Sequence, residues 1–464
     1  MATSLAKINT HEEMQMVSDK QTRTQGYSRP VYIVDGARTP FLKVKGRPGP
    51  FSAADLAVAV GRGLMARQSF AASELDEVIL GCVIPAADEA NIARVVSLRL
   101  GCGERVPAWT VQRNCASGMQ ALATAAERIA GGYSKLVLAG GTESMSHAPV
   151  LWRDSMVEKL ADWQQARSFL DKVKVFGRLR PADFAPVISL LQGLTDPTTN
   201  LSMGQTAENL ATRFGISREA MDSFSLRSHN RLAAAFDQDR MDEVLPLYTT
   251  DGQAVTADEG LRRDGSLEKL AKLKPVFDRH YGRVTAGNSA QITDGAALLL
   301  LADEETVARF DLPVLGRLHQ TAWSGLDPAQ MGLGPVYAID ELIATSDLEN
   351  PQIDLWEINE AFAGQILACL AALQDDEWQQ QELGRKSLVP QIPEESLNVD
   401  GGSVAIGHPV GASGARIVLH LLQALSRQGG GRGIASLCIG GGQGGAMLVS
   451  VEESASQPQK GDNQ

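Results

Sequence analysis

The chain has 464 residues, 44% of them hydrophobic and 21% charged, which is typical of a globular protein long enough for about three domains. Its 43 Lys and Arg against 55 Asp and Glu give a net charge of −12, which disfavours binding to the phosphate backbone of nucleic acids. No apolar run reaches the roughly 18 residues that cross a bilayer, so we expect no transmembrane segment.

The five cysteines show no CxxC spacing, which argues against a disulfide framework and against a zinc site. Residues 1–29 contain no apolar signal-peptide core and include Glu12, Glu13 and Asp19, which disfavours both a secretory signal and a transit peptide. We therefore expect residues 1–29 and 453–464 to be flexible tails and the protein to be cytoplasmic.

The first half of the chain alternates predicted strands and helices. The strand at 135–139 is expected to close at Gly140 and Gly141. Strands that alternate with helices indicate parallel βαβ units. The predicted strands are residues 31–34, 78–84, 108–111 and 135–139, and the predicted helices are residues 52–67 and 116–129.

Residues 148–281 form a different region, rich in Arg, Asp and Gln. Helical patterns cover 206–214 and 218–237, and between them Gly215 is a stop signal and Ser217 an N-cap. We interpret this region as an inserted, mostly helical domain.

The second half repeats features of the first. A strand is predicted at 353–358, and Ala-Ser-Gly begins a helix at residue 412 as it does at residue 116. Each of these helices leads through glycines into a strand that itself ends in glycines, the second at 433–439. This ordered succession predicts a duplicated α/β unit.

Cys115 and His408 stand before the two repeated helices. A cysteine at a helix N-terminus feels the helix dipole, which favours the thiolate, although a buried structural cysteine is an equally good interpretation of position alone. His408 is followed by Pro409 and flanked by glycines, so a rigid open loop presents it, as suits a general base or an oxyanion donor. By contrast, His420 is expected to be a hydrogen-bonded core residue.

Cys438 and Asn359 follow predicted strands. The glycines after Cys438 allow a substrate to approach and can present backbone N–H groups, or they form a turn beside an inert cysteine. Asn359 can cap the helix that follows it, and this does not exclude a functional role.

Together these segments resemble the thiolase family of acyl-CoA acyltransferases and acetyltransferases, over about residues 30–451. Supporting segments are Asp35-Gly36-Ala37-Arg38-Thr39-Pro40, Gly140-Gly141-Thr142-Glu143-Ser144-Met145 and Thr285-Ala286-Gly287-Asn288. The resemblance implies an α/β fold of two similar five-layered βαβαβαββ halves with an inserted loop domain. The implied boundaries are 30–147 plus 282–312, 148–281 and 313–452.

The resemblance also implies catalytic roles. Cys115 matches the acylated nucleophile, His408 the residue that activates it, and Cys438 the acid/base for the acetyl-CoA methyl carbon. Asn359 matches the residue that holds a water which, with His408, stabilises the enolate oxygen. The N–H groups of Cys115 and Gly440 match a second oxyanion hole.

Coenzyme A is implied as a substrate, with no metal and no redox cofactor. Its contacts are implied for Met203, Phe277 and Phe362 in the pantetheine tunnel and for Arg262 near the adenosine phosphates, with Arg263 as an alternative. Ala290 stands where many thiolases have a serine, with Ser289 next to it, and Asp400 stands where an asparagine or an apolar residue is common.

Residues 176–200 and 375–395 are similar to the long thiolase subunit of fatty-acid-oxidation complexes, although those proteins usually have His at the position of Asn359. We therefore expect a degradative 3-ketoacyl-CoA thiolase, a homodimer or homotetramer with a possible hydratase/dehydrogenase partner subunit. The alternatives are an acetoacetyl-CoA-forming acetyltransferase, a ketoacyl-synthase-like condensing enzyme and a non-catalytic acyl-CoA or lipid carrier. The last two are disfavoured because Cys115, His408 and Cys438 are all present.

Overall fold

The computed structural model describes residues 26–346, 352–384, 389 and 391–452. Most of the two predicted tails lies outside these residues. Within residues 26–29, however, the Tyr27 hydroxyl lies 3.0 Å from Oγ1 of Thr321, and Ser28 Oγ donates to the carbonyl oxygen of Ala130 at 3.2 Å. Contacts with the folded body therefore begin slightly before residue 30.

The main strands are β1 (Val31–Arg38), β2 (Leu42–Lys43), β3 (Glu77–Gly81), β4 (Ala108–Val111), β5 (Leu136–Ser144), β10 (Thr293–Ala302), β11 (Gly316–Gly325), β12 (Leu355–Ile358), β13 (Gly431–Ile439) and β14 (Gln443–Val451). They form one sheet in the order β12-β13-β14-β11-β1-β10-β5-β3-β4, with β2 paired to β10. The two halves join where β1 pairs antiparallel with β11.

The two halves of this sheet repeat one strand order. In the first half β5 lies between the parallel β3 and the antiparallel β10, and in the second half β13 lies between the parallel β12 and the antiparallel β14. β4 extends the first half, and a parallel bridge between Trp356 and Leu397 occupies the matching place in the second. The predicted duplication is therefore confirmed.

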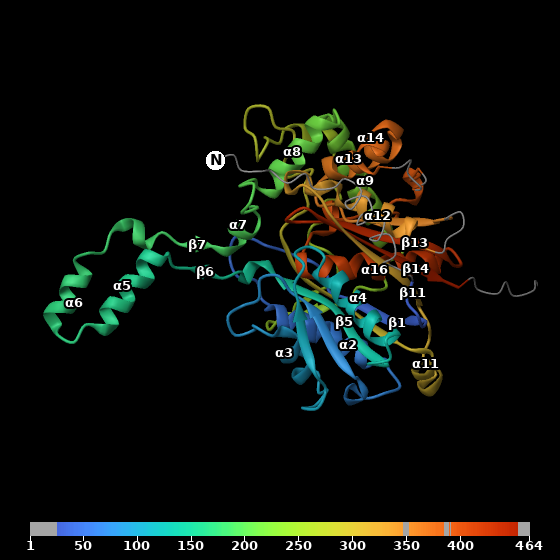
Figure 1. Cartoon of the computed structure of the whole chain (residues 1–464), viewed down its shortest axis with the longest axis horizontal. Coiled ribbons are helices and arrows are strands. Elements are labelled where there is room, and N and C mark those ends of the chain that lie inside the picture. The colour runs from blue at the N-terminus through green and yellow to red at the C-terminus, as the bar shows by residue number, and fades with distance from the viewer. Residues whose placement is uncertain (1–25, 347–351, 385–388, 390, 453–464) are drawn as a thin grey trace, which may run out of the picture.

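Helices divide the molecule into layers (Figure 1). α4 and α16 share one hydrophobic core with strands from both halves of the sheet. α2 and α3 pack against the other face of the first half, and α12 and α13 against that of the second, which makes five layers. These helices are α2 (Ala53–Met65), α3 (Ile92–Arg99), α4 (Ser117–Ala130), α12 (Gly334–Ala344), α13 (Ala363–Gln374) and α16 (Val410–Arg427).

The repeated Ala-Ser-Gly segments are where α4 and α16 touch. A Cβ on Gly118 would lie 2.8 Å from the carbonyl oxygen of Gly411, and a Cβ on Gly414 would lie 2.6 Å from the backbone nitrogen of Met119. Both distances are shorter than carbon can tolerate without displacing backbone. The two helix starts can therefore pack this closely only with glycine at these positions.

β5 corrects one expectation from the sequence. The strand does not end at Gly140 and Gly141 but continues through them to Ser144. A Cβ on Gly141 would lie 1.9 Å from the carbonyl oxygen of Gly411. This glycine is therefore explained by the start of α16, which approaches the strand closely, rather than by a turn.

The inserted region is helical as predicted, and Ser217 caps α9 by accepting from the backbone N–H of Ala220. α8 and α9 pack against α13 in the second half of the molecule. The elements of this region are β6 (Val150–Leu151), α5 (Asp154–Gln165), α6 (Phe169–Phe176), β7 (Val187–Ile188), α7 (Ser189–Gly193), α8 (Met203–Arg213), α9 (Arg218–Asp237), β8 (Leu247–Tyr248), β9 (Ala254–Val255) and α10 (Leu267–Ala271). Outside it lie α11 (Glu304–Phe310), α14 (Asp376–Glu382) and α15 (Ser403–Ile406).

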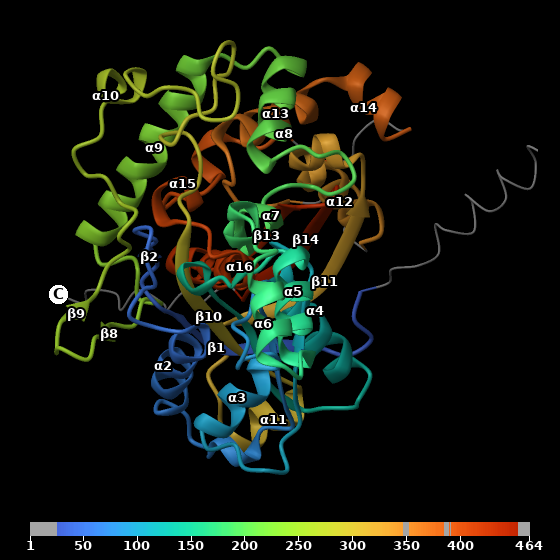
Figure 2. The ribbon, with the colours of Figure 1, turned by 90° about the vertical axis from the view of Figure 1, so that its left-hand side faces the viewer.

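Residues 150–188 form an arm that projects from the body (Figure 1). β6 and β7 pair antiparallel at its base, and α5 and α6 lie at its far end. Seen from the side of the arm, α5 and α6 lie in front of the body (Figure 2). Among the residues described, no helix is both long enough and apolar enough to cross a membrane.

His420 joins the inserted region to α16. Its Nδ1 lies 2.9 Å from Oε1 of Glu243, and its Nε2 lies 3.3 Å from Oδ2 of Asp400, with all three side chains buried. Burial alone would lower the pKa of His420, but the charge and hydrogen bond of Glu243 and the nearby carboxylate of Asp400 raise it to about 9. His420 is thus the hydrogen-bonded buried residue that the sequence predicts, and it is held as a cation.

This cluster predicts how stability depends on pH. The pKa of His420 is about 9 in the folded protein and about 6.5 in an unfolded chain, so its stabilising effect is complete below pH 6.5 and disappears as the pH rises through 9. We expect the melting temperature of the wild type to fall more steeply between pH 6.5 and 9.5 than that of His420→Gln, measured by circular dichroism. Parallel curves for the two proteins would contradict the assignment of His420 as a buried cation.

Candidate active site

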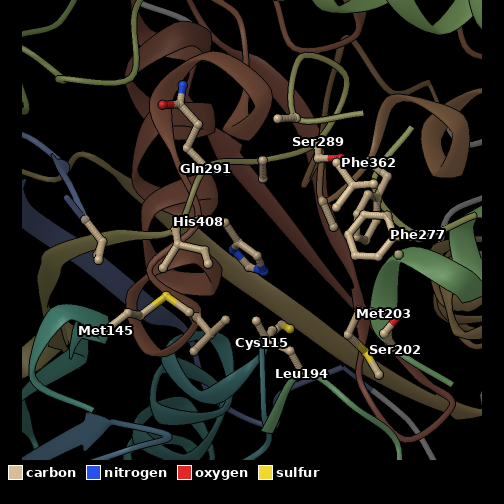
Figure 3. Close-up of a pocket in the computed structure, with 18 of the residues that line it drawn as sticks. Cys115, Met145, Leu194, Ser202, Met203, Phe277, Ser289, Gln291, Phe362 and His408 are labelled. Carbon is tan, nitrogen blue, oxygen red and sulfur yellow. The ribbon is translucent and has the colours of Figure 1, made fainter. Parts of the chain in front are cut away.

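Cys115, His408 and Cys438 line one cavity of about 550 Å³ (Figure 3). The loop before α4, the loop before α16 and the end of β13 supply these side chains. The structure therefore brings together three residues that are far apart in the sequence. The predicted coenzyme A contacts that also line the cavity are Met203, Arg262, Phe277, Ala290 and Phe362.

The loop that carries Cys115 is fixed by Ser117 and Asn114. The Ser117 hydroxyl accepts from the backbone N–H of Arg113 and donates to the carbonyl oxygen of Asn114, both at 2.8 Å. Asn114 has a left-handed φ of +43°, and its Nδ2 donates to the carbonyl oxygen of Gly440 at 2.8 Å. The Cys115 loop is therefore tied to the turn between β13 and β14.

The thiol of Cys115 is not the thiolate that the helix N-terminus led us to expect. Burial raises its pKa above the ordinary value, and the backbone N–H groups of Gly440 and of Cys115 itself only partly oppose that rise. α4 begins at Ser117, two residues beyond Cys115, so desolvation outweighs the effect of the helix end. To act as a nucleophile, this thiol would need a base.

His408 meets the requirements of that base. Its Nδ1 lies 2.7 Å from the Ser413 hydroxyl, which donates its own proton to the carbonyl oxygen of Pro409 at 3.1 Å. The proton of the imidazole is therefore on Nδ1, and Nε2 is buried with no hydrogen-bond partner among the residues described. Burial, aided by the charge of Arg416, lowers the pKa of His408 to about 4, so the ring is neutral at pH 7.

Cys438 suits the role of an acid. It lies near the end of β13, and burial together with the nearby Cys115 raises its pKa well above the ordinary value. Cys438 therefore keeps its proton at neutral pH.

Asn359 and Gly440 contribute no lining surface to this cavity. The N–H of Gly440 faces the Cys115 thiol. Asn359 does not cap the next helix, because α13 begins at Ala363 with Phe362 at its N-cap. Instead, its Oδ1 accepts from the Ser403 hydroxyl at 2.6 Å, and its buried Nδ2 has no hydrogen-bond partner within the described part of the chain.

Glu143 supports the site in a way that the sequence analysis missed. Its buried carboxylate accepts from the backbone N–H groups of Val83 at 2.9 Å, Ile84 at 3.0 Å and Gly411 at 2.9 Å. It therefore joins the loop after β3 to the start of α16. Ser117 and Ser413 were missed as well, although the repeated Ala-Ser-Gly pattern was the signal that could have identified them.

Two aromatic rings form an apolar part of the cavity wall. The rings of Phe277 and Phe362 meet edge to face with centroids 6.1 Å apart. Arg262 lines the cavity, whereas Arg263 does not line it and forms an ion pair with Asp237 at 2.8 Å.

Both Ala290 and Ser289 line this cavity. The Ser289 hydroxyl already donates to the carbonyl oxygen of Thr285 at 2.7 Å. Among the residues described, no group of three or more His, Cys, Asp or Glu side chains is placed to hold a metal ion.

Comparison with known proteins gives matches over nearly the whole chain. Residues 31–305 match the family "Thiolase, N-terminal domain", and residues 312–451 match "Thiolase, C-terminal domain". A 3-ketoacyl-CoA thiolase of Yersinia pestis (strain Pestoides F) is 38% identical over 425 residues, which cover 91% of this chain and 97% of that protein.

Solved structures of similar proteins also match over nearly the whole chain. The structure of human mitochondrial 3-ketoacyl-CoA thiolase in complex with CoA has a TM-score of 0.78 and 34% identity, covering 92% of this chain and 99% of that chain. The Bacillus anthracis acetyl-CoA acetyltransferase has a TM-score of 0.77 and 35% identity, covering 92% of this chain and 100% of that chain.

The geometry predicts which cysteine reacts with an alkylating agent. Cys115 is half-buried while the other four cysteines are buried, so iodoacetamide should modify Cys115 first. Because its thiol needs a base, His408→Asn should slow that modification by about tenfold or more at pH 7. Peptide mass spectrometry against time measures both rates, with Cys115→Ala as the control. Unchanged labelling in His408→Asn would contradict the assignment of the base.

Proposed function

The chain belongs to the thiolase family, and on that premise we propose that it is a 3-ketoacyl-CoA thiolase. It cleaves a 3-ketoacyl-CoA with coenzyme A into acetyl-CoA and a shortened acyl-CoA. The observation that carries the proposal is the single cavity in which a half-buried thiol, a neutral imidazole and a second, protonated thiol meet.

In the first half of the reaction Cys115 is the nucleophile. Nε2 of His408 takes the Cys115 proton, and the thiolate attacks the 3-keto carbon. The bond between C2 and C3 breaks, and its electron pair forms the enolate of acetyl-CoA. Cys438 then gives its proton to C2, which completes acetyl-CoA and leaves the acyl group on Cys115.

In the second half coenzyme A removes that acyl group. The coenzyme A thiol gives its proton to Cys438 and attacks the acyl-enzyme carbonyl. The Cys115 sulfur leaves and recovers its proton from His408, so both thiols and the imidazole return to their starting states. The covalent intermediate divides one difficult step into two easier ones.

Negative charge develops on two oxygens along this path, and we propose a donor set for each. The N–H groups of Cys115 and Gly440 stabilise the oxyanion at the carbonyl attacked on Cys115, in keeping with the Gly440 N–H that faces the thiol. His408 and a water held by Asn359 stabilise the enolate oxygen. A well-placed donor of this kind is typically worth about 3 kcal/mol.

We propose that the two ends of the cavity hold the two ends of the substrate. Met203, Phe277 and Phe362 flank pantetheine, and Arg262 lies toward the coenzyme A phosphates. Met145 lies on the other side of Cys115 from these rings (Figure 3), where it suits an acyl tail. Further apolar residues that line the cavity are Val44, Leu191, Leu194, Ile292 and Val410.

Three finer points complete the proposal. Following the family resemblance, we propose a cytoplasmic homo-oligomer, either a dimer or a tetramer. No metal or redox cofactor enters the mechanism, because the two thiols and the imidazole carry every proton transfer. A hydratase/dehydrogenase subunit is proposed as a partner, bound through the arm.

The exposed apolar surface of the arm supports this proposal. Phe169 is 79% exposed and Phe176 is 72% exposed, and neither lines the cavity. A groove of about 470 Å³ runs along the arm. Exposed apolar patches of this kind mark interaction sites more often than free surface. The residues that line the groove are Trp152, Met156, Lys159, Leu160, Trp163, Val175, Phe176, Leu179 and Phe184.

Cleavage of a 3-ketoacyl-CoA series tests the proposed activity. We expect coenzyme A-dependent loss of the 3-ketothioester absorbance for substrates from acetoacetyl-CoA to 3-ketohexadecanoyl-CoA, with preference for the longer chains. Cys115→Ala should lower turnover by about four orders of magnitude or more without a change in melting temperature. Activity on acetoacetyl-CoA alone would identify an acetyltransferase instead, and no cleavage of any member would favour a carrier.

Removal of the arm separates catalysis from partner binding. Leu151 and Val187 face each other in the β6–β7 pair, so an Asn-Gly turn can replace residues 152–186 and close a hairpin. We expect this variant to cleave 3-ketoacyl-CoA within about twofold of the wild type, because the residues that line the cavity are retained.

The same variant should fail to bind a purified hydratase/dehydrogenase subunit of the same organism in size-exclusion chromatography with light scattering. Phe169→Ser with Phe176→Ser should weaken that binding, whereas Tyr281→Ser, an exposed residue outside the arm, should not. Undiminished complex formation without the arm would contradict the proposed interface.

A further inference from the structure

A row of buried polar side chains leads from α16 to Asn359. Nη2 of Arg416 donates to the Ser403 hydroxyl at 3.2 Å, and that hydroxyl donates to Oδ1 of Asn359 at 2.6 Å. On its other side, Nη1 of Arg416 donates to Oε2 of Glu357 at 3.2 Å. All four side chains are at most 2% exposed, so protein atoms rather than solvent decide how each is oriented.

The direction of these hydrogen bonds fixes the amide of Asn359. A guanidinium can only donate, so Arg416 occupies a lone pair of the Ser403 oxygen and the single hydroxyl proton must point elsewhere. The Ser403 proton points to the carbonyl oxygen of the Asn359 amide. If the amide were turned so that its NH₂ group faced Ser403, that group would be a second donor to the hydroxyl, and the Ser403 proton would have no acceptor. Nδ2 of Asn359 is therefore turned away from Ser403, and it is the buried donor that has no hydrogen-bond partner among the residues described.

We propose that Arg416 and Ser403 are positioning residues that hold the Asn359 amide with Nδ2 free to bind the water that serves the enolate oxygen. This inference rests on the proposed thiolase reaction. The chain of contacts starts on α16, the helix whose first turn also holds His408 through Ser413. One helix thus orients both donors that we assign to the enolate.

The charge of Arg416 also affects His408 and Glu357. It contributes to the low pKa of His408 and so helps to keep that imidazole neutral. Burial raises the pKa of Glu357 to about 7, against the opposing charges of Arg416 and His420. Arg416 is therefore held by Glu357, a carboxylate whose ionised form is disfavoured by burial.

The rates of the two halves of the reaction can be measured separately, and their ratio distinguishes a positioning role from a merely structural one. Cleavage of acetoacetyl-CoA passes through the enolate. Exchange of labelled coenzyme A into butyryl-CoA forms and breaks the Cys115 acyl-enzyme but makes no enolate. A residue that only supports the fold affects both rates, whereas a residue that positions Asn359 affects cleavage alone.

The test uses the full-length protein with Ser403→Ala. We expect kcat for acetoacetyl-CoA cleavage to fall by about tenfold to a hundredfold, since a misplacement of about 1 Å can cost about a hundredfold. KM and the rate of butyryl-CoA exchange should stay within about twofold of the wild type. The matched control is Ser225→Ala, which removes another buried serine hydroxyl, one bonded to the carbonyl oxygen of Met221 in α9, and should leave both rates unchanged.

A second variant keeps the inference testable if Ser403→Ala does not fold. Arg416→Lys keeps the charge but loses the planar fork that reaches Glu357 and Ser403 together, so it should show the same selective loss of cleavage. Equal losses of cleavage and exchange in folded Ser403→Ala and Arg416→Lys, or no loss in either, would overturn the inference. If the wild type itself shows neither reaction, the proposed function fails rather than the positioning role.

Discussion

The close contact between the first turns of α4 and α16 is the constraint on which the site depends. Gly118 and Gly414 allow the two backbones to meet, and Gly141 lets the start of α16 approach β5. Cys115 and His408 each stand immediately before one of these helices. Once the helix starts are packed against each other, a thiol and an imidazole that are nearly 300 positions apart in the sequence must face the same cavity.

Burial then sets the chemistry of that cavity. It raises the pKa of both Cys115 and Cys438 and lowers that of His408, so these three groups are all neutral at rest. In the proposed mechanism charge appears only when a proton moves, and the N–H groups of Cys115 and Gly440 and the amide of Asn359 are the donors proposed to stabilise it. A preorganised environment of this kind is generally the largest contribution to catalysis.

Sequence patterns predicted the duplicated fold and singled out Cys115, His408 and Cys438, because glycine spacing and strand–helix alternation are local signals, whereas the other predicted lining residues came from the family resemblance. They failed where the explanation is a contact between distant segments. Gly141 resembled a turn residue because its partner, Gly411, belongs to the other half of the chain. Asn359 resembled a helix cap for the same reason, since its real partner is Ser403. Burial, too, cannot be read from the position of Cys115 before a helix.

The duplication explains both what the halves share and where they differ. Aligned on Ala-Ser-Gly, Ser117 corresponds to Ser413, and each hydroxyl donates to a carbonyl oxygen of the loop before its own helix. Two residues beyond the glycine, Gln120 of the first half corresponds to Arg416 of the second. The shared serine keeps both loops rigid. The divergent position gives the second half a cation that can orient polar groups at the site. In the proposed mechanism neither half alone supplies both the nucleophile and its partners, so the proposed active site depends on both halves.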